Sequence, residues 1–298
     1  MALPDGIDPQ RFAHILRLAV EEDLAQVGDL TTLLLPPELS SAAGRWEVVA
    51  RQSGCVAGMA ILSEILAALC PHVRAACLLN DGASCPPDTS IVRLEGPVGE
   101  MLTAERTLLN FLQRLCGIAT LTARFVTAVA GTPAVITDTR KTTPGLRDLE
   151  RYAVRCGGGV NHRAGLYSAV LIKDNHLAHL PPERLAFGVF DMLNRIEQLP
   201  RRPDFIEVEV DSLEQLRAVL RVVGVGLVLV DNFAPDALRE AVALRDAEGL
   251  RGRVRLEASG GITLENVRRI AETGVDRISI GALTHSATAL DLGLDARP

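Results

Sequence analysis

Hydrophobic residues follow different patterns before and after Gly117. In the first part, mixed periodicities predict helices over 9–25, 60–69 and 100–115 and strands over 45–51, 73–79 and 90–94. Gly117 is expected to interrupt the helical pattern that precedes it. We therefore expect a separate, mixed α+β domain over residues 1–116, which carries little chemistry of its own.

From residue 117 onward, strand-like runs alternate with helical patterns. The pattern predicts strands over 134–137, 169–172, 205–210, 226–230, 254–257 and 277–280, and helices over 118–130, 146–155, 183–199, 213–223, 235–248 and 264–273. This alternation predicts parallel strands joined by crossover helices. The near-continuous apolar run over 226–230 is typical of a strand covered on both faces.

The strand count favours an incomplete barrel. Six strands are predicted, and residues 160–162 are a candidate seventh. A closed α/β barrel needs eight. We therefore expect the α/β class, with an incomplete (open) α/β barrel over 117–283. A doubly wound open sheet is the alternative.

The composition is ordinary for an enzyme built of βα repeats and argues against several other classes. The 298 residues are 48% hydrophobic, and their net charge of -6 argues against a nucleic-acid binder. Apolar runs stay short of the roughly 18 residues that span a bilayer, and charges near the N-terminus argue against a signal peptide. The six cysteines lack zinc-type spacing and are expected to be reduced core residues. We expect a cytoplasmic protein that binds neither nucleic acid nor membrane.

One stretch reverses the charge of the chain. Residues 138–176 contain seven Lys/Arg and four Asp/Glu, a net charge of +3. Five cationic or potentially cationic residues lie there, just past predicted strands or next to the glycine triplet 157–159: Arg140, Lys141, His162, Arg163 and Lys173. Groups beyond the carboxyl ends of parallel strands face one crevice. The pattern therefore indicates a small, highly anionic ligand, against the alternative of solvated loop charges.

Later strands add carboxylates and glycines. Glu207 and Glu209 alternate onto one face, and Glu209 is the better site candidate because it is nearer the carboxyl end. Asp231 follows the next strand, where the alternative is a helix N-cap or turn residue. Ser259–Gly261, with Thr263 as the expected N-cap of the following helix, and Gly281 predict a phosphate cradle. Tight turns without a ligand are the alternative.

Five motifs carry a resemblance to a known family. They are Asp138-Thr-Arg-Lys-Thr-Thr-Pro-Gly-Leu146, Gly157-Gly-Gly-Val-Asn-His-Arg163, Leu171-Ile-Lys-Asp-Asn-His176, Leu256-Glu-Ala-Ser-Gly-Gly-Ile262 and Gly281-Ala-Leu-Thr-His285. In this order they resemble the quinolinate phosphoribosyltransferases. The resemblance implies an N-terminal α/β sandwich domain, expected to include segment 284–298, an incomplete α/β barrel, and a homodimer with shared active sites.

The resemblance also implies a role for each site residue. The residues expected to act in catalysis are Lys141, Glu209 and Asp231. The substrate is expected to be bound by Thr139, Arg140, His162, Arg163, Lys173 and Arg106 of the partner subunit. The phosphate is expected to be bound by Ser259, Gly260, Gly261, Ile280, Gly281, Ala282 and His285. By spacing alone, Arg106 would be a solvated helix residue. Mg²⁺ is expected as cofactor, carried by phosphoribosyl pyrophosphate near Glu209 and Asp231 without a direct protein ligand.

The implied reaction is pentosyl transfer from phosphoribosyl pyrophosphate to quinolinate with loss of CO2, a step of NAD biosynthesis. Two alternatives remain: a nicotinate-type phosphoribosyltransferase, and a non-catalytic anion-binding paralogue associated with molybdenum transport. The sequence departs from the family at Ser168, where an acidic residue is usual, and the spacing from Glu209 to Asp231 suggests a small insertion.

Overall fold

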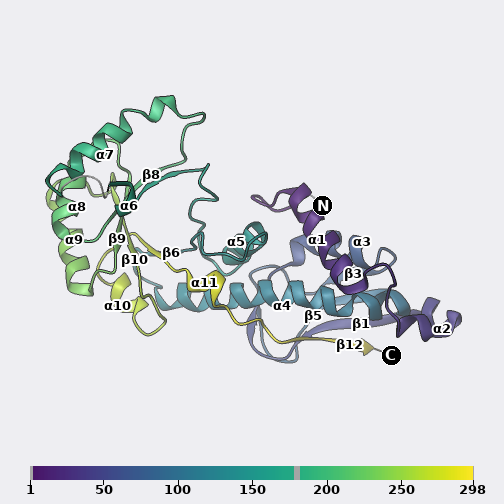
Figure 1. The fold of residues 1–298 in the computed structure, drawn as a ribbon. Helices are drawn as coiled ribbons and strands as arrows, with labels where there is room; N and C mark the ends of the chain where they lie inside the picture. The colour runs from purple at the N-terminus through teal and green to yellow at the C-terminus, as the bar shows by residue number, and fades with distance from the viewer. Residues whose placement is uncertain (1–2, 178–181, 298) are drawn as a thin grey trace. The chain divides into compact units, whose positions relative to one another are not determined.

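The computed structural model describes residues 3–177 and 182–297. Its chain separates into two compact units (Figure 1). The first comprises Met1–Ala123, Lys141–Gly159 and Ala282–Pro298, and the second comprises Arg124–Arg140 and Val160–Gly281. The chain therefore passes between the units several times, and residues distant in sequence complete each of them.

The first unit is built on an antiparallel sheet in the order β12-β1-β5-β3. Its strands are β1 (Ala43–Ala50), β3 (Arg74–Cys77), β5 (Ser90–Pro97) and β12 (Leu292–Arg297), beside a small pair of β2 (Gly54–Cys55) and β4 (Ser84–Cys85). In β1, Val48 lies opposite both Val92 and Leu294. The last strand of the chain thus pairs with the first.

Short helices and one long helix complete this unit. They are α1 (Pro9–Leu24), η1 (Thr32–Leu34), α2 (Pro37–Ser41), η2 (Met59–Ile61), α3 (Leu62–Leu69), α4 (Val98–Ala128), α5 (Arg147–Cys156) and α11 (Ala282–His285). The predicted start of α1 is confirmed, since the side chain of Asp8 accepts a hydrogen bond from the Arg11 N–H. The expectation of core cysteines is wrong at Cys77, which is exposed on β3.

Helix α4 corrects the prediction that Gly117 interrupts the helix. It runs unbroken through this position for 31 residues. A Cβ at Gly117 would lie 2.2 Å from the Thr288 carbonyl oxygen, because the C-terminal segment crosses the helix there. The glycine therefore permits close packing between two segments distant in sequence, which a local pattern cannot reveal.

The second unit is built on a parallel sheet in the order β6-β11-β10-β9-β8-β7. The strands are β6 (Val135–Thr137), β7 (Val170–Ile172), β8 (Ile206–Val210), β9 (Leu227–Asp231), β10 (Arg255–Ser259) and β11 (Arg277–Ser279). Successive strands add in one direction, and the first joins the last, as in a barrel. A doubly wound sheet would reverse direction at a switch point. The incomplete α/β barrel is confirmed, and the candidate seventh strand is a single bridge between Val160 and Thr137.

The helices of this unit are shorter than the pattern predicts. They are α6 (Asp174–Leu177), η3 (Pro182–Arg184), α7 (Leu185–Leu193), η4 (Ile196–Gln198), α8 (Leu213–Val219), α9 (Pro235–Ala247) and α10 (Val267–Ala271). The helix expected over 183–199 is three pieces, the last ending before Pro200, which disfavours helical geometry at the residue before it. Over the described residues, no helix has both the length and the apolar character needed to cross a bilayer.

Candidate active site

A buried aspartate, Asp138, connects through hydrogen bonds the two loops that contain Arg140 and Arg163. Asp138 follows β6 and is fully buried. Its Oδ1 accepts the backbone N–H of His162 at 2.7 Å, and its Oδ2 accepts the Asn161 amide at 2.6 Å. Arg140 therefore leaves β6, and Arg163 follows His162, from segments bound to the same carboxylate.

Arg163 and Arg140 influence each other electrostatically. Burial lowers the pKa of the Arg163 guanidinium, and the charge of Arg140 lowers it further, while Glu207 and Glu209 oppose the shift. Two guanidiniums held near each other repel, so the pair gains most from a ligand with more than one negative charge. Arg140 and Arg163 therefore share one electrostatic environment.

An ion pair lies at the adjacent ends of β7 and β8. Lys173 Nζ is 2.6 Å from Glu209 Oε2, with the lysine half-exposed and the glutamate mostly buried. The lysine backbone N–H donates to His176 Nδ1 at 2.9 Å. Because Glu209 also acts on Arg163, this pair belongs to the same charged region. Glu209 can hold Lys173 in place until an anionic ligand takes over that role.

Asp231 ends β9 and stands opposite Ser259, the last residue of β10. It is not the N-cap of α9, which is Ala234, so the N-cap alternative is excluded. Its carboxylate accepts the Asn232 amide at 2.7 Å. Asp231 and Glu209 therefore end neighbouring strands, where both can act on a ligand at the carboxyl edge.

The glycine loop after β10 is held against the end of β9. Gly260 has φ +91°, and a Cβ there would lie 2.0 Å from Asn232 Oδ1, so only glycine fits. Gly261 has φ +59° and open space in the direction of a Cβ. Thr263 is not the helix N-cap as expected: α10 starts later, capped by Asn266, whose Oδ1 accepts the Thr263 N–H. A phosphate cradle at this position would therefore depend on loop amides instead of a long helix behind them.

The loop after β11 has one fewer backbone N–H available for a phosphate than the sequence predicted. Ile280 is buried, and its backbone N–H donates to the Thr137 carbonyl at 3.0 Å. Any contribution of Ile280 to phosphate binding cannot come from that N–H. The backbone amides from Gly281 onward remain the candidates at the end of β11.

Four predicted site residues belong to the first unit: Arg106, Lys141, Ala282 and His285. Arg106 lies on α4 with 63% of its side chain exposed. The Lys141 carbonyl accepts the Thr284 hydroxyl at 2.7 Å, which anchors the peptide next to Arg140 to α11. His285 is exposed and bonds Ser286 through Nδ1. The Arg106 guanidinium lies 3.9 Å from Glu105 Oε1.

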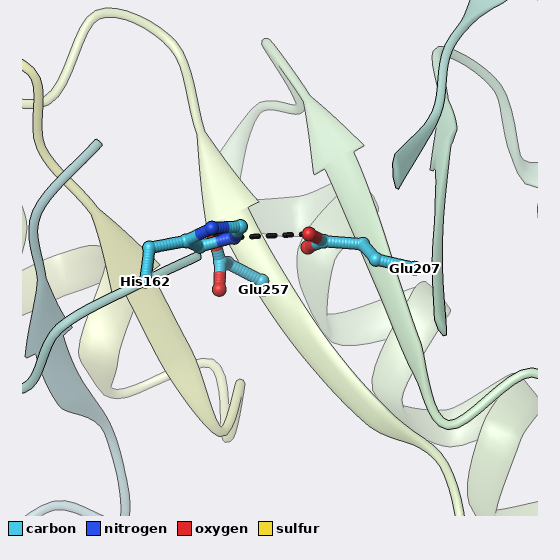
Figure 2. Close-up of side chains that lie close together, drawn as sticks. All are labelled: His162, Glu207 and Glu257. Carbon is cyan, nitrogen blue, oxygen red and sulfur yellow. Dashed lines mark ion pairs between the residues drawn. The ribbon is translucent and has the colours of Figure 1, made fainter. Parts of the chain in front are cut away.

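His162 lies inside the barrel sheet rather than among exposed cations. Its Nε2 is 2.9 Å from Glu207 and 3.4 Å from Glu257 (Figure 2). Burial by itself lowers the pKa of His162, but hydrogen bonds and charges of both glutamates outweigh it and raise the pKa to about 9. Sequence reasoning missed Glu257 and its partner Arg277. The available signal was a charge within an apolar strand, which needs a partner.

Two further sequence features serve local structure. The glycine triplet ends α5, and a Cβ at Gly157 or Gly159 would strike residues of α4. Ser168, the departure from the family pattern, is buried, and its hydroxyl accepts the backbone N–H groups of Ala164 and Gly165. Ser168 therefore closes the loop after Arg163 with neutral hydrogen bonds.

Comparison with known proteins settles the family. The N-terminal domain model of quinolinate phosphoribosyl transferase matches residues 29–116, and the C-terminal domain model matches residues 118–295. The chain belongs to the quinolinate phosphoribosyltransferase family.

Relatives and solved structures of this family match over nearly their full length. The nicotinate-nucleotide pyrophosphorylase [carboxylating] of Mycobacterium leprae is 43% identical, covering 94% of this chain and 95% of that protein. The probable enzyme of the same name from Bacillus subtilis is 40% identical, covering 92% and 89%. The structure of the nicotinate-nucleotide pyrophosphorylase from Francisella tularensis matches with a TM-score of 0.87 at 34% identity, covering both chains fully.

Proposed function

We propose that this chain transfers the phosphoribosyl group of phosphoribosyl pyrophosphate to quinolinate and releases CO2, giving nicotinate mononucleotide and pyrophosphate. The observation that carries the proposal is the coupled pair Arg140–Arg163 beside the Lys173–Glu209 ion pair. Quinolinate has two adjacent carboxylates, and planar guanidiniums bind carboxylates in a bidentate manner. Relatives named for the carboxylating reaction support the same activity.

The two lysines of the chain support a role in catalysis. Among 31 basic residues, Lys141 and Lys173 are the only lysines, and both fall in the proposed site. An ammonium is a compact, strongly hydrated point charge that suits pyrophosphate oxygens, whereas arginine favours planar partners. A chain that uses arginine at every other basic position thus has lysine where phosphoribosyl pyrophosphate would bind.

The reaction needs positioning and electrostatics rather than a covalent intermediate. The pyridine nitrogen attacks C1 of the ribose as the bond to pyrophosphate breaks, and the ribose becomes oxocarbenium-like. Glu209 and Asp231, at the ends of β8 and β9, would stabilise this positive charge and hold the ribose hydroxyls. CO2 then leaves, and the ring, positively charged at its nitrogen, accepts the electrons before the carbon takes a proton.

The 5′-phosphate would bind the backbone amides of the loops after β10 and β11. Gly260 keeps its loop against Asn232, and the open side of Gly261 gives an anion access. The neighbouring oxygen donors Glu209 and Asp231 suit Mg²⁺, a hard cation that prefers oxygen ligands. When bound with the pyrophosphate, Mg²⁺ would neutralise part of its charge.

Release of labelled CO2 tests this function. Carboxyl-labelled quinolinate should release CO2 only when phosphoribosyl pyrophosphate and Mg²⁺ are both present. A nicotinate-type enzyme would instead use nicotinate without CO2 release, and a non-catalytic anion binder would turn over neither. Either result would refute the proposal.

Lys141→Ala should reduce turnover by roughly 10²–10³-fold, as loss of one electrostatic donor does. Lys141→Arg retains the charge but changes its shape, and we expect most of the loss to persist. Lys141 is exposed, so neither substitution should affect folding. Steady-state kinetics and a thermal unfolding curve check both points. Turnover near wild type in Lys141→Ala would contradict the assigned role.

A further inference from the structure

Four buried charged or titratable side chains meet on the interior face of the barrel sheet. Glu207 comes from β8, Glu257 from β10, and His162 from the segment after Val160 (Figure 2). The fourth, Arg277, comes from β11. Both glutamates are fully buried, and the histidine and arginine are nearly so. None of these residues except His162 has a role in the proposed reaction. Burying two carboxylates is costly, so the cluster requires an explanation.

With Arg277 positive, both glutamates negative and His162 neutral, the cluster has a net charge of −1. It becomes neutral only if it binds one extra proton. Arg277 Nε is 2.6 Å from Glu257 Oε2, which neutralises that carboxylate. The second negative charge, on Glu207, is then neutralised by a proton shared with His162, whose Nε2 is 2.9 Å away. Burial and the charge of Glu257 raise the pKa of Glu207. The His162–Glu207 pair therefore keeps its proton at neutral pH.

The other ring nitrogen of His162 faces Arg163. Its Nδ1 accepts the backbone N–H of Arg163 at 2.8 Å, so the ring proton lies on Nε2, toward the glutamates. The extra proton then resides on the Glu207 side of the pair, and the raised pKa of about 9 describes the loss of this shared proton. A histidine that binds a metal through Nε2 must carry its proton on Nδ1, so this hydrogen bond argues against a metal among the same three side chains. The ring also stands edge-on to Phe205, with centroids 5.3 Å apart. Both nitrogens are thus committed within the protein.

Arg163 needs such an anchor. Its guanidinium is buried beside Arg140, which repels it. Its Nη1 lies 3.5 Å from the carbonyl oxygen of Ala169. Repulsion by Arg140 favours movement of the Arg163 side chain away from the site, and the hydrogen bond to His162 Nδ1 opposes that movement from the backbone side.

We propose that Glu207, Glu257 and Arg277 are positioning residues: they fix the ring of His162, which in turn fixes Arg163 for one carboxylate of the substrate. This inference depends on the proposed function for the identity of the substrate, but its structural part does not. It also changes the role expected of His162, from substrate contact to the link between a buried charge cluster and a substrate-binding arginine.

Kinetics of Glu207→Gln and Glu257→Gln test the proposal. Each variant keeps the shape and removes one charge. The KM for quinolinate should rise roughly 10- to 100-fold, as expected when a binding group is misplaced, while the KM for phosphoribosyl pyrophosphate changes by less than about threefold. A purely structural role would change both constants together or only reduce the amount of active enzyme.

Asp276→Asn is the matched control. Asp276 precedes β11 at the amino edge of the same sheet, where it accepts hydrogen bonds from buried Arg245 at 2.6 Å and from the Leu256 N–H at 2.7 Å. This variant also breaks a partly buried ion pair, far along the strands from the carboxyl edge. It should lose stability and leave the ratio of the two KM values unchanged. A shifted ratio in the control would overturn the proposal.

A second readout works even without turnover. The Cε1–H resonance of His162 should titrate well above neutral pH in the wild type and about one pH unit or more lower in Glu207→Gln. If the wild type releases labelled CO2 but the KM ratio does not move, the positioning role is wrong. If it releases none, the proposed function fails, and the titration alone decides whether the charge cluster holds the ring. A stoichiometric metal in the purified wild type, lost in Glu257→Gln, would also overturn the proposal.

Discussion

Individual residues show that exposed and buried charged side chains have different roles in this protein. Arg140 and Lys173 follow strand ends, and Glu209 is the second-last residue of β8, as their sequence positions predict. Glu207 lies only two residues before Glu209 and shares its face of β8, yet it is fully buried and pairs inside the protein. Position along β8 therefore distinguishes Glu209, which can contact a ligand, from Glu207, which can only support the site.

His162 links the buried charges to the pH dependence of stability. Its pKa rises from 6.5 to about 9 in the folded protein, because the hydrogen bonds and charges of Glu207 and Glu257 outweigh burial. A raised pKa stabilises the folded state fully below pH 6.5, and this stabilisation is lost as the pH rises through about 9. We expect the wild type to lose on the order of 1–3 kcal/mol more stability than Glu207→Gln between these pH values.

Urea unfolding at both pH values measures this difference. Other groups titrate in the same range, so the comparison with Glu207→Gln isolates the contribution of the pair. Parallel losses in the two proteins would show that the carboxylate does not govern the titration of His162.

At the scale of elements, periodicity predicted the strands of the barrel but not the contacts that limit its helices. The apolar run over β9 indicated burial on both faces, and four of its five residues are buried. In contrast, the turn closed by Asn266 shortens α10, and the crossing of Thr288 explains Gly117. These depend on side-chain bonds and distant segments, which local spacing does not encode. The buried partners of His162, Glu207 and Glu257, come from two strands, and this pairing was missed for the same reason.

Gly117→Ala tests the packing argument within α4. Alanine is a better helix former than glycine by roughly 1 kcal/mol, so an isolated helix would gain stability. Here its Cβ would meet the Thr288 carbonyl at 2.2 Å, and overpacking of this kind typically costs about 1–3 kcal/mol. We expect a net loss of stability in chemical denaturation.

Gly226→Ala is the control for this substitution, because its Cβ would meet nothing within 4 Å. It should change the free energy of unfolding far less. A stability gain in Gly117→Ala would mean that the C-terminal segment does not press on the helix.

At the scale of the whole molecule, the predicted site residues come from both compact units. Arg106 and Lys141 belong to the first, and Arg140, Arg163 and Lys173 to the second. The family resemblance implies that Arg106 serves the site of a partner subunit, and its 63% exposed side chain is free to reach outward from α4. The proposed homodimer therefore has a specific functional consequence.

Mixing two inactive variants tests the shared site. Arg106→Ala and Lys141→Ala should each be nearly inactive alone. After unfolding and refolding together in equal amounts, half of the dimers are mixed, and each mixed dimer has one intact site of two. Activity should then recover to about one quarter of wild type. No recovery, with dimers present by light scattering, would place Arg106 in the site of its own subunit.

The pairing of β12 with β1 determines the order in which the protein can be completed during synthesis. Until β12 (Leu292–Arg297) has been synthesised, β1 has no partner on one of its edges. In the complete protein, this edge pairs with β12, where Val48 lies opposite Leu294. Every strand of the barrel has been synthesised before β12. The second unit therefore has all its strands before the first unit does, and the unpaired edge of β1 is the surface that chaperones would need to shield meanwhile.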